Sequence, residues 1–274
     1  MSGSAWPDRT SHDVQSEHEK EGITMNGTVT EERPAVRRNG DLVAANRILV
    51  AQGVLDAFGH VSVRTAPGSE TFWLSRNLAP GSVTVTDLLE HDLDGNATDA
   101  RSPYLERFIH AEIYRHRPDV TAVVHSHSPS VVPFSVVDVP LRPVVHMAGF
   151  LAEHATPVFE IRDVVGDASD LLITSSALGA ALAETLGDAA VALMRGHGSV
   201  AVGKTLPEAV FRAVYTEVNA RTQAAALALG APCYLAPGEG AAADASIGSQ
   251  VARAWDIWRK QSGLDGSGPA EDGW

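Results

Sequence analysis

The sequence has little cysteine and no long apolar run, and each absence excludes a class of protein. Cys233 is the single cysteine among 274 residues, so the chain holds neither an internal disulfide nor a thiolate metal cluster. No apolar run approaches the roughly 20 residues that a membrane-spanning helix needs, and the first 22 residues lack the apolar core of a signal peptide. We therefore expect a soluble protein in the reducing environment of the cytoplasm, without a membrane partner.

Positive charge is also scarce. Lysine and arginine total 21 against 34 acidic residues, which gives a formal net charge of −13. This balance argues against nucleic acid as a partner. Hydrophobic residues make up 44% of the chain, enough for a globular protein with a sizeable core.

Polar residues dominate both ends of the chain. Residues 1–38 show no periodic apolar face and are predicted to be a disordered tail. Residues 263–274 are rich in Gly, Ser and Pro and are predicted to be a loose C-terminal tail. The stretch between them contains neither a linker nor a repeat, so a single domain over residues 39–262 is predicted.

Helical and strand-like patterns interleave through this domain. Helices are predicted over residues 41–56 (with Asp41 as N-cap), 102–117, from 128 onward and 205–230. Strands are predicted over residues 60–64, 71–75, 88–96 and 120–125, with two more in 189–203. Interleaved elements of this kind predict an α/β domain whose central sheet is covered by helices on both faces.

The stretch "TAVVHSHSPS", residues 121–130, places His125 and His127 at the end of an apolar strand. Residues i and i+2 of a strand project to the same side, and the carboxyl end of a strand is where open α/β sheets hold ligands. Imidazole is the usual ligand of zinc, iron or manganese when thiolates are absent. The alternative is that one histidine caps the next helix and the other is merely exposed.

"MRGHGSVAVG" supplies a third candidate ligand, His197, in a turn flanked by glycines. A polar residue in such a turn is common, but three histidines would make a catalytic metal site with open coordination positions. Glu106 is predicted in the first turn of its helix, with His110 one turn further on the same face. Glu106 could serve the site or simply interact with the helix dipole.

Taken together, "YLERFIHAEIYRHRPDVTAVVHSHSP" and the later "RGHGSVAVG" resemble the class II aldolase/adducin-like family over roughly residues 40–232. The resemblance implies that His125, His127 and His197 bind one divalent metal ion (zinc, manganese or iron) and that Glu106 is the catalytic acid/base. It also implies a three-layer α/β/α fold with nine strands in a mixed, mainly antiparallel sheet. A homotetramer with active sites near the subunit interfaces is implied as well.

The chain departs from the sugar-phosphate aldolases of that family where they bind phosphate. In place of their small and amide residues it carries His60, Ser75, Arg76 and a bulky Tyr104. Arg76 could bind a carboxylate through two parallel hydrogen bonds, with His60 as a further donor. Arg76 could instead pair with an acidic surface neighbour.

The phrases "LDAFGHVSVR", "WLSRNLAPG" and "RPVVHMAGF" resemble the decarboxylase branch of the family. The predicted substrate-binding residues are Ser75, Arg76, His60 and His146, and His91 and His116 are interpreted as surface residues. The resemblance implies a metal-dependent decarboxylase of a hydroxylated aromatic or related carboxylic acid. Alternatives are a non-haem Fe(II) oxygenase acting on a hydroxyphenylpyruvate or mandelate, an aldolase for a substrate without phosphate, and an adducin-like structural domain.

Overall fold

The computed structural model describes residues 34–152 and 155–263, which belong to one compact unit of the chain. Most of the predicted N-terminal tail, residues 1–33, lies outside the described residues, as do residues 264–274 of the predicted C-terminal tail. No helix in the described ranges has the length and apolar character that crossing a membrane requires.

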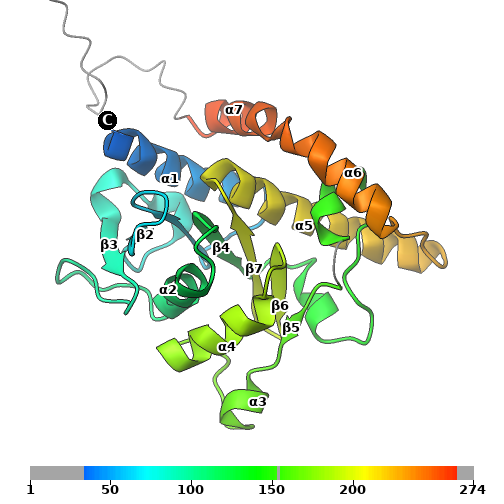
Figure 1. The fold of residues 1–274 in the computed structure, drawn as a ribbon, viewed down its shortest axis with the longest axis horizontal. Helices are drawn as coiled ribbons and strands as arrows, with labels where there is room; N and C mark the ends of the chain where they lie inside the picture. Colours follow the sequence, from blue (N-terminus) through cyan, green and yellow to red (C-terminus); the bar gives the residue numbers. More distant parts are fainter. Residues whose placement is uncertain (1–33, 153–154, 264–274) are drawn as a thin grey trace, which may run out of the picture. The chain divides into compact units, whose positions relative to one another are not determined.

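A seven-stranded sheet forms the centre of the described unit, in the order β3-β2-β1-β4-β7-β6-β5 (Figure 1). The strands are β1 (His60–Arg64), β2 (Thr71–Ser75), β3 (Leu88–Asp92), β4 (Ala122–Ser126), β5 (Val158–Phe159), β6 (Val191–Met194) and β7 (Gly198–Gly203). Every neighbouring pair is antiparallel except β5 and β6. The mixed, mainly antiparallel sheet is therefore confirmed, with seven strands in the described residues where the resemblance implied nine.

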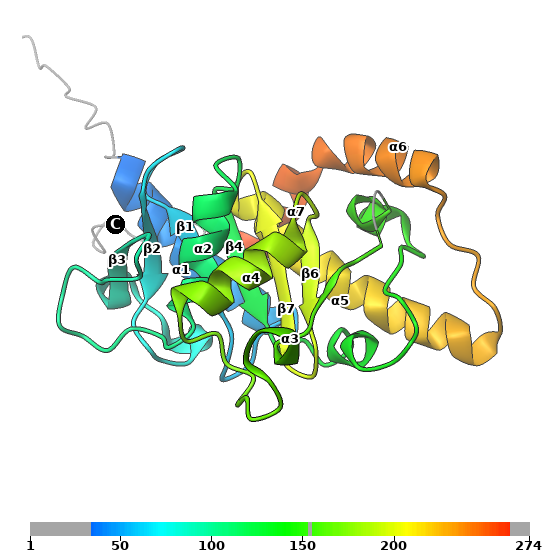
Figure 2. The ribbon, with the colours of Figure 1, turned by 60° about the horizontal axis from the view of Figure 1, so that its bottom comes forward.

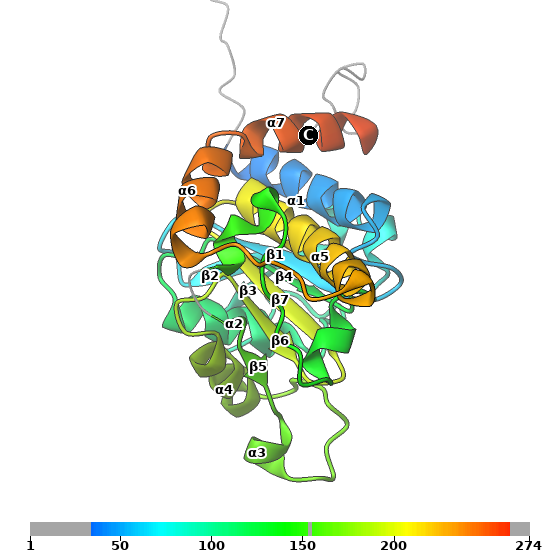
Figure 3. The same cartoon turned by 90° about the vertical axis from the view of Figure 1, so that its right-hand side faces the viewer.

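Helices cover both faces of this sheet (Figure 3). They are α1 (Pro34–Ala51), α2 (Arg107–His116), α3 (Arg162–Val165), α4 (Ser176–Leu186), α5 (Leu206–Leu229), α6 (Pro237–Gly248) and α7 (Val251–Gln261). Helices α1, α5 and α7 contact one another on one face, and α2 and α4 pack together on the other (Figure 2). Two apolar clusters fill the spaces between the sheet and these helices.

Alternation along the strands decides which face each side chain joins. Val61 and Val124 enter the cluster beneath α1 and α5, whereas Val123 enters the cluster beneath α2 and α4. Ser62 lies directly opposite Val123, and His60 lies opposite His125. Because paired residues project to the same face, these polar side chains lie on the α2 side of the sheet.

Four predicted helix boundaries are wrong: α1 ends at Ala51 and not at residue 56, and the other three have a local reason. Helix α1 begins at Pro34 instead of Asp41, because proline suits a first helical position and no helix-breaking residue follows it before Gly40. Residues 102–106 are not helical, since the Ser102 carbonyl accepts the Asn77 amide at 2.9 Å and Pro103 bridges to Arg76. The segment after residue 128 forms only a 3-10 helix, η3 (Val132–Ser135).

Candidate metal centre

The two histidines of the HxH pair lie at the end of β4. His125 is fully buried and projects toward α2, and His127 follows directly after the strand. Helix α2 begins beside them, so Glu106, its N-cap residue, brings a carboxylate that is 8% exposed to the same place. The sheet edge and the helix start thus converge on one point.

His197 comes to this point because the β6–β7 turn is built on glycines. Gly196 has φ +67°, a conformation that favours glycine, and its amide donates to the Ser135 hydroxyl at 2.9 Å. A Cβ on Gly198 would lie 2.2 Å from the Ser126 carbonyl oxygen. Only glycine therefore lets β7 approach β4 closely enough to set His197 against His127.

The three imidazole rings turn the same nitrogen toward one another. His127 Nε2 lies 3.1 Å from His125 Nε2 and 3.0 Å from His197 Nε2. Glu106 Oε2 lies 3.6 Å from His125 Nε2 and 3.6 Å from His197 Nε2. One possible ligand atom from each of the four residues falls within 4.8 Å of all the others.

The surroundings favour the protonation states that metal binding requires. The Ser199 carbonyl lies 3.2 Å from His125 Nδ1, so the proton resides on Nδ1 and leaves the Nε2 lone pair free. Burial, with the neighbouring His125 and His197, lowers the pKa of His127 to about 4. Burial acts to raise the pKa of Glu106, but protons on Nε2 of His125 and His197, which a bound metal ion would replace, outweigh it and hold that pKa well below its usual value.

This donor set fits a divalent metal ion. Three imidazole lone pairs and a carboxylate oxygen gather at one partly enclosed point, an arrangement that a cation would neutralise. Nδ1 of His197 is buried and has no hydrogen-bond partner among the described residues. The other Glu106 oxygen, Oε1, accepts the Ile173 amide at 3.0 Å, which fixes the carboxylate's orientation.

Of the predicted substrate-binding residues, His60 lies beside this cluster and Ser75 is connected to His60 through Tyr104. The His60 ring centroid is 5.0 Å from that of His125 and 4.5 Å from that of Tyr104. Ser75 is buried at the end of β2, with its hydroxyl 3.4 Å from the Tyr104 hydroxyl. Tyr104 therefore joins the two residues along one side of the site.

The other two predicted substrate-binding residues are more peripheral. The Arg76 side chain is 41% exposed, and its Nε pairs with Asp87 at 2.7 Å. An ion pair with an acidic neighbour was the alternative to substrate binding considered for Arg76. His146 begins the 3-10 helix η4 (His146–Leu151) and is exposed. It makes no hydrogen bond or ring contact with the three histidines among the described residues.

Some important neighbours of the site were not predicted from the sequence. Glu217, on α5 and 4% exposed, accepts a hydrogen bond from the Ser128 hydroxyl and two from Ser130, its amide at 3.2 Å and its hydroxyl at 2.5 Å. It thereby anchors the loop that follows His127. A glutamate at an otherwise inward position of the long predicted helix was the available signal.

The interpretation of His91 as a surface residue is wrong. It is fully buried and stacks on Phe72 with ring centroids 5.3 Å apart. The strand alternation of residues 88–92 places it on the covered face, opposite Phe72 in β2.

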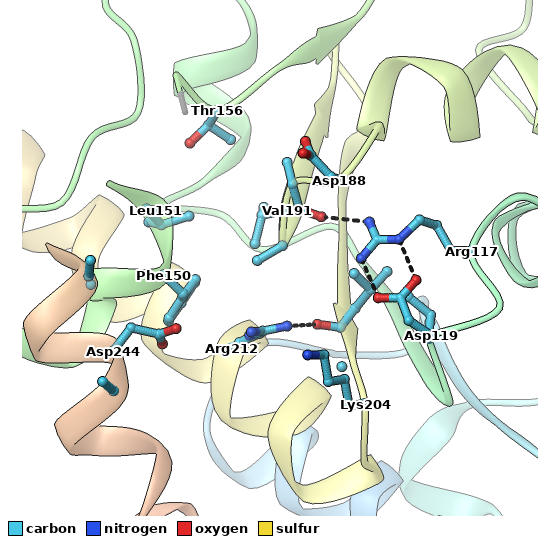
Figure 4. Close-up of a pocket in the computed structure, with 18 of the residues that line it drawn as sticks. Arg117, Asp119, Phe150, Leu151, Thr156, Asp188, Val191, Lys204, Arg212 and Asp244 are labelled. Atoms are coloured by element: carbon cyan, nitrogen blue, oxygen red, sulfur yellow. Dashed lines mark hydrogen bonds and ion pairs between the residues drawn. The ribbon is translucent and has the colours of Figure 1, made fainter. Parts of the chain in front are cut away.

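A separate pocket of about 710 Å³ opens at the other end of the strands (Figure 4). Its lining includes Val120 before β4, Val191 at the start of β6 and Gly203 at the end of β7. Arg117 and Asp119 form a two-point ion pair along its wall, with both N–O distances 2.8 Å. The pocket therefore does not contain the histidine cluster.

The fold and the candidate metal cluster together are those of an α/β protein of the class II aldolase type, and sequence comparison agrees. The family model for the class II aldolase and adducin N-terminal domain matches residues 40–224. The chain belongs to this family.

Individual relatives point in the same direction. Decarboxylase TropJ of Talaromyces stipitatus is 44% identical over 203 residues, which cover 69% of this chain and 76% of that protein. The 3,4-dihydroxyphthalate decarboxylase of Arthrobacter keyseri is 29% identical over 195 residues, 65% of this chain and 74% of that protein. The solved structure of an aldolase II superfamily protein from Pseudomonas syringae superposes on this chain with a TM-score of 0.70 at 25% identity. The superposition covers 88% of this chain and 96% of that protein.

Proposed function

We propose that this chain is a divalent-metal-dependent carbon–carbon lyase that decarboxylates a hydroxylated aromatic or related carboxylic acid. The observation that carries the proposal is the convergence of three imidazole Nε2 atoms beside the Glu106 carboxylate. His127 Nε2 lies 3.1 Å from His125 Nε2 and 3.0 Å from His197 Nε2. The similarity to two proteins named decarboxylases supports the choice of reaction.

His125, His127 and His197 would hold the ion, which can be zinc, manganese or iron. When bound, such an ion acts as a Lewis acid that stabilises negative charge on a substrate oxygen. The Ser199 carbonyl and the glycine turn keep the imidazoles oriented for this role.

Glu106 would carry the proton in the reaction. The bond between the ring carbon and the carboxylate breaks, CO2 leaves, and the electron pair stays with the ring carbon. Glu106 takes a proton from water and passes it to that carbon, so the net reaction consumes one proton. The Ile173 amide, bonded to Oε1, leaves Oε2 as the oxygen that faces the cluster.

Arg76 would bind a substrate carboxylate at the mouth of the site. Its ion pair with Asp87 engages Nε, and a guanidinium has further donors that can bind a carboxylate in parallel. Ser75 and His60 would line the same side, and His146 is kept as a substrate-binding candidate.

The enzyme is proposed to work as a homotetramer. Three large apolar side chains are exposed: Phe58 at 66%, Leu105, which precedes Glu106, at 60%, and Val136, near Gly196, at 56%. Phe58 lies 6.3 Å from the His127 ring. A second copy that covers these side chains would remove them from water and enclose the site.

The test is CO2 release under strict anaerobiosis from a panel of hydroxyaromatic acids, with added zinc, manganese or iron. We expect release that depends on the metal, and a fall of about 10²- to 10⁴-fold in kcat for Glu106→Gln with the metal retained. The exposed Glu184→Gln serves as the matched control. Full turnover by Glu106→Gln would refute the acid/base role.

Other products would refute the decarboxylase reaction itself. Oxygen consumption with iron bound would identify an oxygenase, and a trapped aldehyde would identify an aldolase. Metal content of the purified protein, measured before any addition, separates these outcomes further.

A further inference from the structure

A chain of buried hydrogen bonds runs from His60 into the layer between the sheet and α2. His60 Nδ1 lies 2.6 Å from His110 Nε2, and His110 Nδ1 lies 2.6 Å from the Ser62 hydroxyl. The Ser62 hydroxyl in turn lies 2.7 Å from the Tyr114 hydroxyl. All four side chains are at most 3% exposed, so water does not compete for these contacts.

This chain of hydrogen bonds ends, at His60, beside the histidine cluster. His60 lies directly opposite His125 in the β1–β4 pairing, and the two ring centroids are 5.0 Å apart. His60 Nδ1 is already engaged by His110, so Nε2 is the ring nitrogen that a ligand can reach. What His60 offers a ligand therefore depends on where its one proton resides.

Tyr114, at the far end of this chain of hydrogen bonds, determines which group donates in each bond. The Tyr114 hydroxyl lies 3.3 Å from the Thr121 carbonyl oxygen, which can only accept a hydrogen bond. If Tyr114 donates to Thr121, its oxygen accepts from Ser62, Ser62 accepts from His110 Nδ1–H, and His110 Nε2 accepts from His60 Nδ1–H. The opposite direction would lose the bond to Thr121.

The direction of donation fixes the proton of His110, which donates through Nδ1, accepts through Nε2 and therefore carries one proton. His60 donates through Nδ1 and is 3% exposed, and such burial disfavours the charged ring that a second proton on Nε2 would give.

We infer that Tyr114, Ser62 and His110 are positioning residues that fix His60 as the Nδ1–H tautomer, so that its Nε2 accepts a hydrogen bond from a hydroxyl group of the substrate. The inference rests on the proposed function, because it assigns the ring hydroxyl of the hydroxyaromatic acid to His60. It also changes the expected role of His60 from a donor to a carboxylate into an acceptor for a hydroxyl. The substrate carboxylate is then left to Arg76.

The tautomer can be measured directly. The full chain, labelled with ¹⁵N-histidine and loaded with zinc, would be examined by two-bond ¹H–¹⁵N correlation spectra, with His60→Gln used to assign the His60 signals. We expect a protonated Nδ1 and an unprotonated Nε2. A proton on Nε2 of His60 in the unaltered protein would overturn the inference, and the variant serves only to assign the signals.

Ser62→Ala tests the chain itself. Without the Ser62 hydroxyl His110 loses its acceptor, so His60 should show both tautomers. Thr216→Val is the matched control, since it removes a buried hydroxyl that bonds only within α5, to the Arg212 carbonyl at 2.6 Å. An unchanged His60 tautomer in Ser62→Ala would count against the chain.

Ligand binding supplies the second readout. Salicylate and 2-methoxybenzoate differ by a methyl on the hydroxyl, and the ratio of their dissociation constants would be measured by calorimetry in the zinc-loaded proteins. Ser62→Ala should reduce the preference for salicylate by about three- to tenfold, the value of one hydrogen bond, while Thr216→Val keeps it. The metal's own share of the preference is the same in each protein, so an unchanged ratio in Ser62→Ala would refute the hydroxyl role.

Neither readout requires turnover, which separates this inference from the proposed function. If no acid releases CO2 but the tautomer and the binding ratios are as expected, the proposed reaction fails and the inference stands. If decarboxylation occurs while His60 carries its proton on Nε2, the inference alone fails.

Discussion

Replacing Glu217 should loosen the loop that carries His127. This buried carboxylate on α5 accepts hydrogen bonds from the Ser128 hydroxyl and from the amide and hydroxyl of Ser130. Those residues follow His127 directly, so Glu217 supports one proposed metal ligand without touching the histidine cluster. Glu217→Ala removes all three bonds, and Glu217→Gln keeps one acceptor oxygen.

The magnitude follows from what each group loses. A hydrogen bond to a charged group contributes about 1.5–3 kcal/mol, but removing the buried charge also relieves its own desolvation cost. Ser130 is half-buried and can turn to water, whereas Ser128 is 1% exposed and its hydroxyl is left unsatisfied. We expect Glu217→Ala to lower the free energy of unfolding by about 2–4 kcal/mol and Glu217→Gln by about 1–2 kcal/mol.

Urea unfolding of the metal-free proteins measures this loss, and zinc titration measures the effect on the site. Zinc should bind about tenfold more weakly to Glu217→Ala, in line with the loss of a group that orients a metal ligand. The exposed Glu184→Gln should stay within about 0.5 kcal/mol of the unaltered protein. If Glu217→Ala unfolds at the same urea concentration and binds zinc equally well, the carboxylate does not anchor the loop.

Three further expectations concern the metal, the pH and the substrate. Removing the metal with a chelator should lower the free energy of unfolding by about 2.7 kcal/mol, relative to the protein at a metal concentration 100 times the dissociation constant. The stability of His127→Ala should not change with chelator. If the chelator destabilises His127→Ala as much as the unaltered protein, His127 is not a metal ligand. Burial lowers the pKa of His91 from 6.5 to about 4. Between these two pH values the unfolded chain therefore binds more protons at His91 than the folded chain does. The contribution of His91 to the free energy of unfolding is complete above pH 6.5 and is lost as the pH falls toward 4. Unfolding in urea at pH 7 and pH 5 should therefore show about 2 kcal/mol more loss in the unaltered protein than in His91→Gln, and parallel losses would contradict this. Arg76→Gln should raise KM for a carboxylate substrate about tenfold while changing unfolding by less than about 1 kcal/mol, since its ion pair with Asp87 is partly exposed; an unchanged KM would remove Arg76 from the site.

Much of the fold could be predicted because its signals are local. The strands at residues 60–64 and 71–75 match the predicted segments residue for residue, and Thr205 caps the long helix α5 through the Glu208 amide. The errors lie where distant parts of the chain override local preference. Ser102 and Pro103 suit a helix start, yet the neighbouring Arg76 and Asn77 hold them extended.

The same division applies to the site. His125, His127, His197 and Glu106 were candidates from their spacing and from the family resemblance, and the structure brings all four together. Their supporting contacts could not be read from the sequence, because they join residues about 50 to 90 positions apart. The bonds from Ser62 to His110 and from Ser128 to Glu217 depend on strand register and helix placement, which no local pattern specifies.

The pairing of β4 with β7 would make binding of the proposed metal ion depend on correct folding. Val124 opposes Ala201 and His125 opposes Val200, so the paired residues are 77 and 75 positions apart in the chain. A slip of β4 by one residue would turn His125 to the α1 and α5 face and remove it from His197. An unfolded or misregistered chain can offer only part of the ligand set, so a tightly bound ion stabilises the native register over every neighbouring one.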